Sequence, residues 1–113
     1  MNRFLYVKEI LDESVGGSTA TVGGPHRAFW RSQSRDQFVA FKIIGLPIVA
    51  LGKGNESNII KALRGEAPFG SDIGTPDASI RRMPAGRDPI PADRIAFISS
   101  WIDDGCPEDA VLP

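Results

Sequence analysis

The sequence predicts an all-α fold of about four short helices joined by long irregular loops. Segments near both ends of the chain carry apolar residues at spacings of three and four, which is the period of a helix buried on one side. No segment shows the sustained alternation of apolar and polar residues that is typical of a half-buried strand. Residues 66–89, where proline and glycine are scattered without a repeat, are expected to form a long irregular segment.

Length and charge limit the organisation of the chain and its partners. With 113 residues and 42% apolar content, residues 1–113 are expected to form a single domain with a modest core. The formal net charge of −1 gives no field that would draw the domain to nucleic acid or to an anionic membrane. Neither of these partners is therefore expected.

The first predicted helix covers about residues 3–15 and ends at Gly16-Gly17. Its apolar stripe is formed by Phe4, Val7, Ile10 and Leu11. Charged residues interrupt this segment, so it does not resemble a signal peptide, and no stretch approaches the roughly 20 apolar residues of a membrane span. The chain is therefore expected to be soluble and cytoplasmic.

Two shorter helices are predicted in the middle of the chain. Ser34 followed by Gln37 is a capping box, which predicts a helix over about 35–43 that stops at Gly45. The segment "NESNIIKALRG" predicts a third helix over about 56–64. Its cap is expected at Asn55 and its end at Gly65.

The last helix has the clearest signals. Pro91 suits the first turn of a helix, and Gly105 and Pro107 are typical of residues beyond its end. The inward stripe consists of Ile95, Ile98 and Ile102, with Phe97 and Trp101 paired four residues apart.

The order of these segments resembles the class I cytochrome c domain. The resemblance is carried by the "SNIIKALRG" helix, the Met83-Pro84 loop and the final "ADRIAFISSWIDDG" helix. It implies that the first and last helices cross, that the middle helix flanks a haem, and that His26 and Met83 stand where the two axial ligands would be.

One departure from that family decides what kind of haem is possible. Covalent c-type haem needs Cys-x-x-Cys-His, and here the residues before His26 read Val22-Gly23-Gly24-Pro25. The only cysteine is Cys106, so covalent attachment is excluded and no cofactor is expected. The alternative is non-covalent haem on His26 and Met83, since an imidazole and a thioether suit an electron-transfer iron.

Aromatic and basic residues supply the remaining candidate positions. The vacated crevice is expected to be lined, and largely filled, by Phe29, Trp30, Phe38, Phe41 and Phe69. A partly open crevice that holds a small ligand is the alternative. Arg27, Arg31, Arg35, Arg81 and Arg82 are the candidate docking positions for a partner, and solvated surface charge is the simpler explanation for them.

The sequence carries no motif for an enzyme. There is a single histidine, and Gly52-Lys53-Gly54 lacks the spacing of a phosphate-binding loop. The predicted function is therefore a non-catalytic, haem-free module for interaction with an unidentified protein, accessory to a larger redox enzyme by family analogy. A haem electron-transfer protein and a small-ligand carrier are the alternatives.

Overall fold

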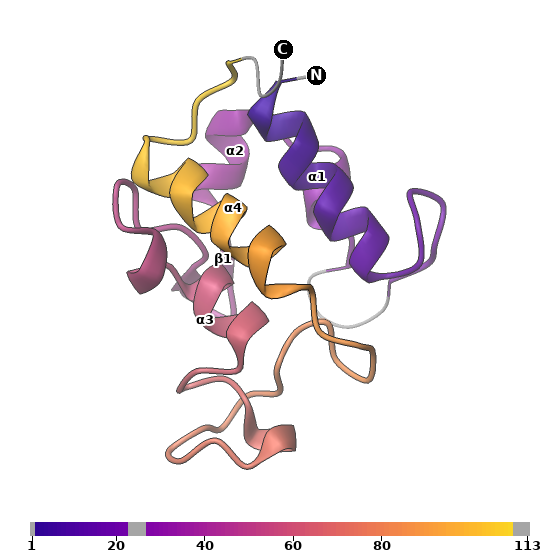
Figure 1. The fold of residues 1–113 in the computed structure, drawn as a ribbon, viewed down its shortest axis with the longest axis vertical. Helices are drawn as coiled ribbons and strands as arrows, with labels where there is room; N and C mark the ends of the chain where they lie inside the picture. Colours follow the sequence, from indigo (N-terminus) through magenta and orange to yellow (C-terminus); the bar gives the residue numbers. More distant parts are fainter. Residues whose placement is uncertain (1, 23–26, 110–113) are drawn as a thin grey trace.

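The computed structural model describes residues 2–22 and 27–109. Its elements, in chain order, are α1 (Arg3–Ser14), η1 (Phe29–Arg31), α2 (Arg35–Ala40), β1 (Lys42–Ile43), β2 (Leu46–Pro47), η2 (Gly54–Glu56), α3 (Asn58–Arg64), η3 (Ser71–Ile73) and α4 (Ala92–Asp103), where η marks a short 3-10 helix. The domain is mostly helical, with one small hairpin and long loops (Figure 1).

The helices at the two ends of the chain form the centre of the core. Phe4 of α1 stacks on Trp101 of α4, with ring centroids 5.8 Å apart and planes 11° apart. Phe38 of α2 packs edge-on against both rings. The stripes predicted from the sequence are buried on both terminal helices, which confirms them. The α1 bounds agree with the predicted range of about 3–15, and Pro91 is the N-cap of α4.

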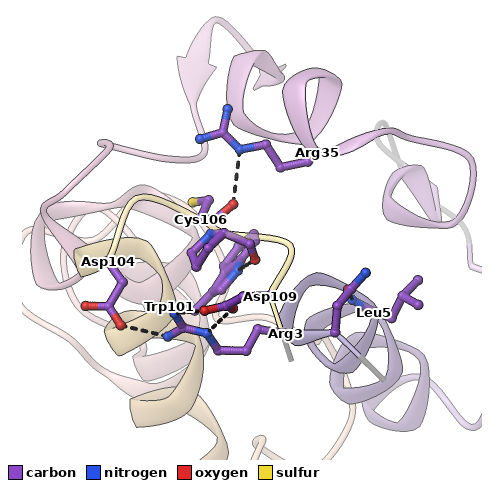
Figure 2. Close-up of polar contacts among 9 residues, drawn as sticks. Arg3, Leu5, Arg35, Trp101, Asp104, Cys106 and Asp109 are labelled. Carbon is purple, nitrogen blue, oxygen red and sulfur yellow. Dashed lines mark hydrogen bonds and ion pairs between the residues drawn. The ribbon is translucent and has the colours of Figure 1, made fainter. Parts of the chain in front are cut away.

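A single arginine joins the two ends of the chain (Figure 2). Arg3 donates from Nε and Nη2 to the carboxylate of Asp109, at 2.7 and 3.0 Å, and from Nη1 to Asp104 at 2.7 Å. Its backbone N–H also donates to the carbonyl of Asp109, at 2.8 Å. The segment after α4 is thereby held against the start of α1.

The all-α prediction is wrong in one segment, because the second helix ends earlier than expected. Its capping box at Ser34 forms as predicted, but Phe41 is extended (φ −71°, ψ 142°) and ends the helix at Ala40. The chain then enters an antiparallel hairpin whose two strands are too short to produce a visible alternation. Ile44 and Gly45 form its turn, with φ of 53° and 76°.

The third helix starts at Asn58, and its cap is Ser57 rather than Asn55. Asn55 is unavailable because its side-chain oxygen accepts from Arg64 at 2.8 Å and from Ser99 at 3.2 Å. The three residues before Ser57 form η2 instead of the first helical turn.

The long segment 66–89 is closed on itself by one bridge and anchored on α3. Phe69 and Ile80 form an isolated parallel bridge, which closes the loop that contains η3. The Met83 N–H donates to the Ala62 carbonyl at 2.9 Å and so anchors the segment on α3. In Figure 1 this segment lies at the end of the molecule opposite the two termini.

Across residues 2–22 and 27–109, the model contains no helix with the length and apolar character needed to cross a membrane.

Candidate functional site

The main candidate site is an apolar cavity of about 540 Å³. It lies between the C-terminal end of α1, η1, the hairpin, α3 and the segment 69–87. Each of these contributes apolar side chains, among them Val15, Trp30, Ile43, Leu63, Phe69 and Met83. The volume lies within the roughly 300–1,000 Å³ that is usual for small-molecule sites.

A partly buried polar network fixes one wall of the cavity. The Asp12 carboxylate on α1 accepts from Trp30 Nε1 at 2.9 Å and from Arg31 Nε at 2.7 Å. Arg31 also donates to the carbonyls of Ala20 and Gly17, at 2.7 and 2.9 Å. The network therefore holds the indole of Trp30 in the cavity wall. It also fixes residues 17–20, which lead to the lining residues Thr21 and Val22.

The opposite wall is the segment that contains Met83 and the turn after it. The Arg87 N–H donates to the Pro84 carbonyl at 3.2 Å, which closes the turn. The Arg82 side chain stabilises this turn by donating to the carbonyls of Met83 and Arg87, at 3.3 and 2.9 Å. The thioether of Met83 is thereby held in the lining of the cavity.

The hairpin supplies a third part of the lining, which sequence reasoning missed. Ile43, Ile44 and Leu46 line the cavity, and Ile44 at the turn is 72% exposed. A β-branched residue with φ of 53° is rare, because its Cβ crowds the following carbonyl. The one available signal was Ile44-Gly45 before Pro47, since Gly at the second turn position is typical of a tight hairpin.

The aromatic residues only partly take the places expected of them. Phe29, Trp30 and Phe69 line the cavity, but Phe38 is buried in the core between α1 and α4, and Phe41 stacks on Phe29 at 4.7 Å. The rings of Phe29, Phe38 and Phe41 pack on neighbouring aromatic rings, and the cavity lies beside Phe29, Trp30 and Phe69. That the five rings fill the crevice of a lost haem stays a prediction.

Of the two residues expected as haem ligands, one can be placed. Met83 lines the cavity and is half-buried. His26 lies outside the described residues.

The arginines expected to dock a partner do not share one helix. Arg31 belongs to η1 and donates to Asp12. Arg35 of α2 donates to the carbonyl of Cys106 (Figure 2) and also to that of Gly105. Arg27 lies in the turn before η1. Arg81 and Arg82 directly precede Met83 and the turn formed by residues 84–87. Docking of a partner on any of these five arginines stays a prediction.

Two polar side chains in the lining, Ser14 and Asn58, serve the fold. Ser14 donates to the Leu11 carbonyl at 2.6 Å, and Asn58 donates to the Pro47 carbonyl at 2.8 Å. Within the described ranges, the lining contains no histidine, cysteine, aspartate or glutamate, and no group of three such side chains could hold a metal. Cys106 is fully buried outside this lining, and burial raises the pKa of its thiol to about 11.

Comparison with protein-family models, with curated proteins and with solved structures gave no significant match for this chain.

Proposed function

We propose that this domain binds a small, predominantly apolar molecule in the cavity between α1, η1, the hairpin and α3. The observation that carries the proposal is the open volume of about 540 Å³ with an apolar lining. Apolar surface that faces such a volume lacks the contacts that side chains normally make in a core, so an apolar ligand would gain them on binding.

The chemistry of the lining favours binding over catalysis. The Ser14 hydroxyl and the Asn58 amide each donate to a backbone carbonyl, and within the described ranges the lining has no histidine, cysteine or carboxylate to act as a base. The lining residues are instead those that exclude water and give shape. A carrier, sensor or ligand-stabilised interaction domain fits these properties.

We further propose that the architecture is that of a class I cytochrome c domain that has lost covalent haem. The order of the helices, the contact between α1 and α4, and the position of Met83 beside the cavity support this proposal. On this account the cavity occupies the place of the lost haem, and a smaller or non-covalent ligand takes its role in ordering the long segment 66–89.

A neutral fluorescent probe tests the proposed function. We expect N-phenyl-1-naphthylamine to bind saturably at one site and to raise the melting temperature. Ala62→Phe should weaken this binding at least tenfold, because Ala62 lines the cavity and the new ring would occupy it. The matched control is Ala96→Phe on the exposed face of α4, which should bind the probe like the wild type.

Ala62→Leu is measured alongside, since the smaller side chain is more easily accommodated by the fold. Thermal unfolding of each variant shows that it is folded. Equal probe affinity in the wild type and in both folded Ala62 variants would contradict binding in this cavity.

Haem bound without covalent links is the second candidate ligand, favoured by the position of Met83 in the lining. Met83 would supply a thioether ligand and His26 an imidazole, and the bound haem would supply one-electron transfer. Titration with haemin should then give a saturable Soret band that shifts in Met83→Leu, a substitution that nearly conserves volume. A band that is unchanged in Met83→Leu would contradict ligation by Met83.

A further inference from the structure

The cavity is apolar throughout most of its lining, but two arginines, Arg81 and Arg87, border it on one side. Both come from the segment that contains Met83. Their positively charged side chains differ from the apolar rest of the lining, so the negatively charged end of a ligand would face them.

Arg81 precedes the turn formed by residues 84–87 and Arg87 ends it, and their guanidinium groups have different neighbours. A Cβ added to Gly86 would lie 3.9 Å from Arg81 Nη2, which places that group against the turn. A Cβ added to Gly16 would lie 3.6 Å from Arg87 Nη1, which places the second group over the end of α1. Arg82 adds a third positive charge, because it donates to the Arg87 carbonyl at 2.9 Å.

Among the described residues, one ion pair involves Arg81 or Arg87, and its contact is loose. The Asp72 carboxylate accepts the Arg82 backbone N–H at 2.7 Å, but it lies 3.9 Å from Arg81 Nε, which is a loose contact. Arg81 keeps a side-chain exposure of 60%. Arg87 has no ion-pair partner among residues 2–22 and 27–109. A guanidinium group whose counter-charge is loose or absent attracts an anion.

We propose that the ligand is an alkyl carboxylate, with its chain in the cavity and its carboxylate at Arg81 and Arg87. Guanidinium groups bind planar carboxylates through paired, charge-assisted hydrogen bonds, while the apolar lining accommodates the chain. This inference rests on the proposed function, since it assigns a ligand class to the same cavity.

The test compares dodecanoate with dodecanol, two ligands of the same chain length that differ in charge. Dodecanoate is titrated below its micelle-forming concentration and dodecanol below its solubility limit, with displacement of N-phenyl-1-naphthylamine as the readout. We expect dodecanoate to bind at least tenfold tighter than dodecanol, and the difference to shrink as salt is raised. Arg87→Gln and Arg81→Gln should each reduce this affinity ratio by about fivefold.

Lys53→Gln is the matched control, because it removes one exposed positive charge outside the cavity lining and should leave the ratio unchanged. Equal affinities for dodecanoate and dodecanol in the wild type would overturn the inference while leaving cavity binding intact. A ratio that is the same in both arginine variants and in the wild type would also overturn it. Binding of none of the three ligands would contradict the proposed function itself.

Discussion

Gly54 lies in close contact with α4. It is buried, and its N–H donates to the Asp103 carboxylate at 2.6 Å. A Cβ at this position would lie 2.2 Å from the backbone oxygen of Ser99 on α4. The sequence shows Gly54 only as part of a glycine-rich turn, and its role in close packing depends on a neighbour 45 residues away, by subtraction of 54 from 99.

Gly54→Ala is expected to lower the free energy of unfolding by about 3 kcal/mol, because η2 or α4 must shift to accommodate the methyl group. Chemical denaturation measures this loss. Gly52→Ala is the control: its φ of 78° is unfavourable for alanine, but nothing lies within 4 Å of the added Cβ, so the loss should be about 1 kcal/mol. Equal losses for the two variants would contradict the close contact.

At the scale of elements, the hairpin shows a local conflict between residue and conformation. Ile44 occupies a left-handed turn position that favours Asn or Gly, and its side chain is largely exposed at the edge of the cavity. Such an outlier persists only where the surrounding structure enforces it, and it is often found beside a functional site. The Ile44 side chain is therefore expected to contribute to ligand binding in the cavity and not to stabilise the turn.

Ile44→Asn tests this idea, because Asn-Gly is the preferred pair for this type of turn. We expect the free energy of unfolding to rise by about 1 kcal/mol and the affinity for an apolar probe to fall. Leu51→Asn, which removes a similarly exposed apolar side chain away from the cavity lining, should not raise stability. A lower stability of Ile44→Asn would refute the strain assigned to this turn.

The elements that the sequence predicts well are those whose signals are local. The stripes of α1 and α4 repeat over 12 residues each, and capping at Ser34 needs only Gln37, so these features can be read without tertiary contacts. The start of α3 was misplaced because Asn55 bonds to Arg64 and Ser99, a choice that depends on the packing of α4. The hairpin was missed because two-residue strands have no period to detect.

At the scale of the whole molecule, Arg3 joins segments that are far apart in the sequence, because it binds Asp104 and Asp109, both more than 100 positions away. Hydrogen bonds from Arg3 lower the pKa of Asp109 below its usual value of 3.8. Because the pKa is lower in the folded state, the ionised carboxylate contributes stability that is fully present above pH 3.8 and is lost as the pH falls further.

Arg3→Gln should therefore lower the melting temperature at pH 6 and have a smaller effect as the pH falls below 3.8. Thermal unfolding followed over this pH range measures the change. Lys42→Gln removes a charge from a lysine of the hairpin that makes no ion pair within the described ranges, and it should have little effect at any of these pH values. An Arg3→Gln effect that is independent of pH would contradict the role of the Asp109 carboxylate.

The cavity itself is a property of the whole molecule, and the sequence indicated only part of it. Three of the five expected aromatic residues line it, and so does Met83. Whether their rings fill a crevice or surround it depends on how they pack, since Phe38 lies within the core and Phe41 stacks on Phe29. The lining from the hairpin had no signal strong enough to place it beside α3.

The most direct test of the account is to locate a bound apolar ligand by NMR. With N-phenyl-1-naphthylamine at saturation, we expect intermolecular nuclear Overhauser effects between the naphthyl ring and the methyl groups of Leu63 and Met83, which line the cavity. The exposed side chains of Leu5 and Leu51 outside the lining serve as the reference for surface binding. Contacts to Leu5 or Leu51 without contacts to Leu63 and Met83 would contradict the central claim that the cavity is a binding site.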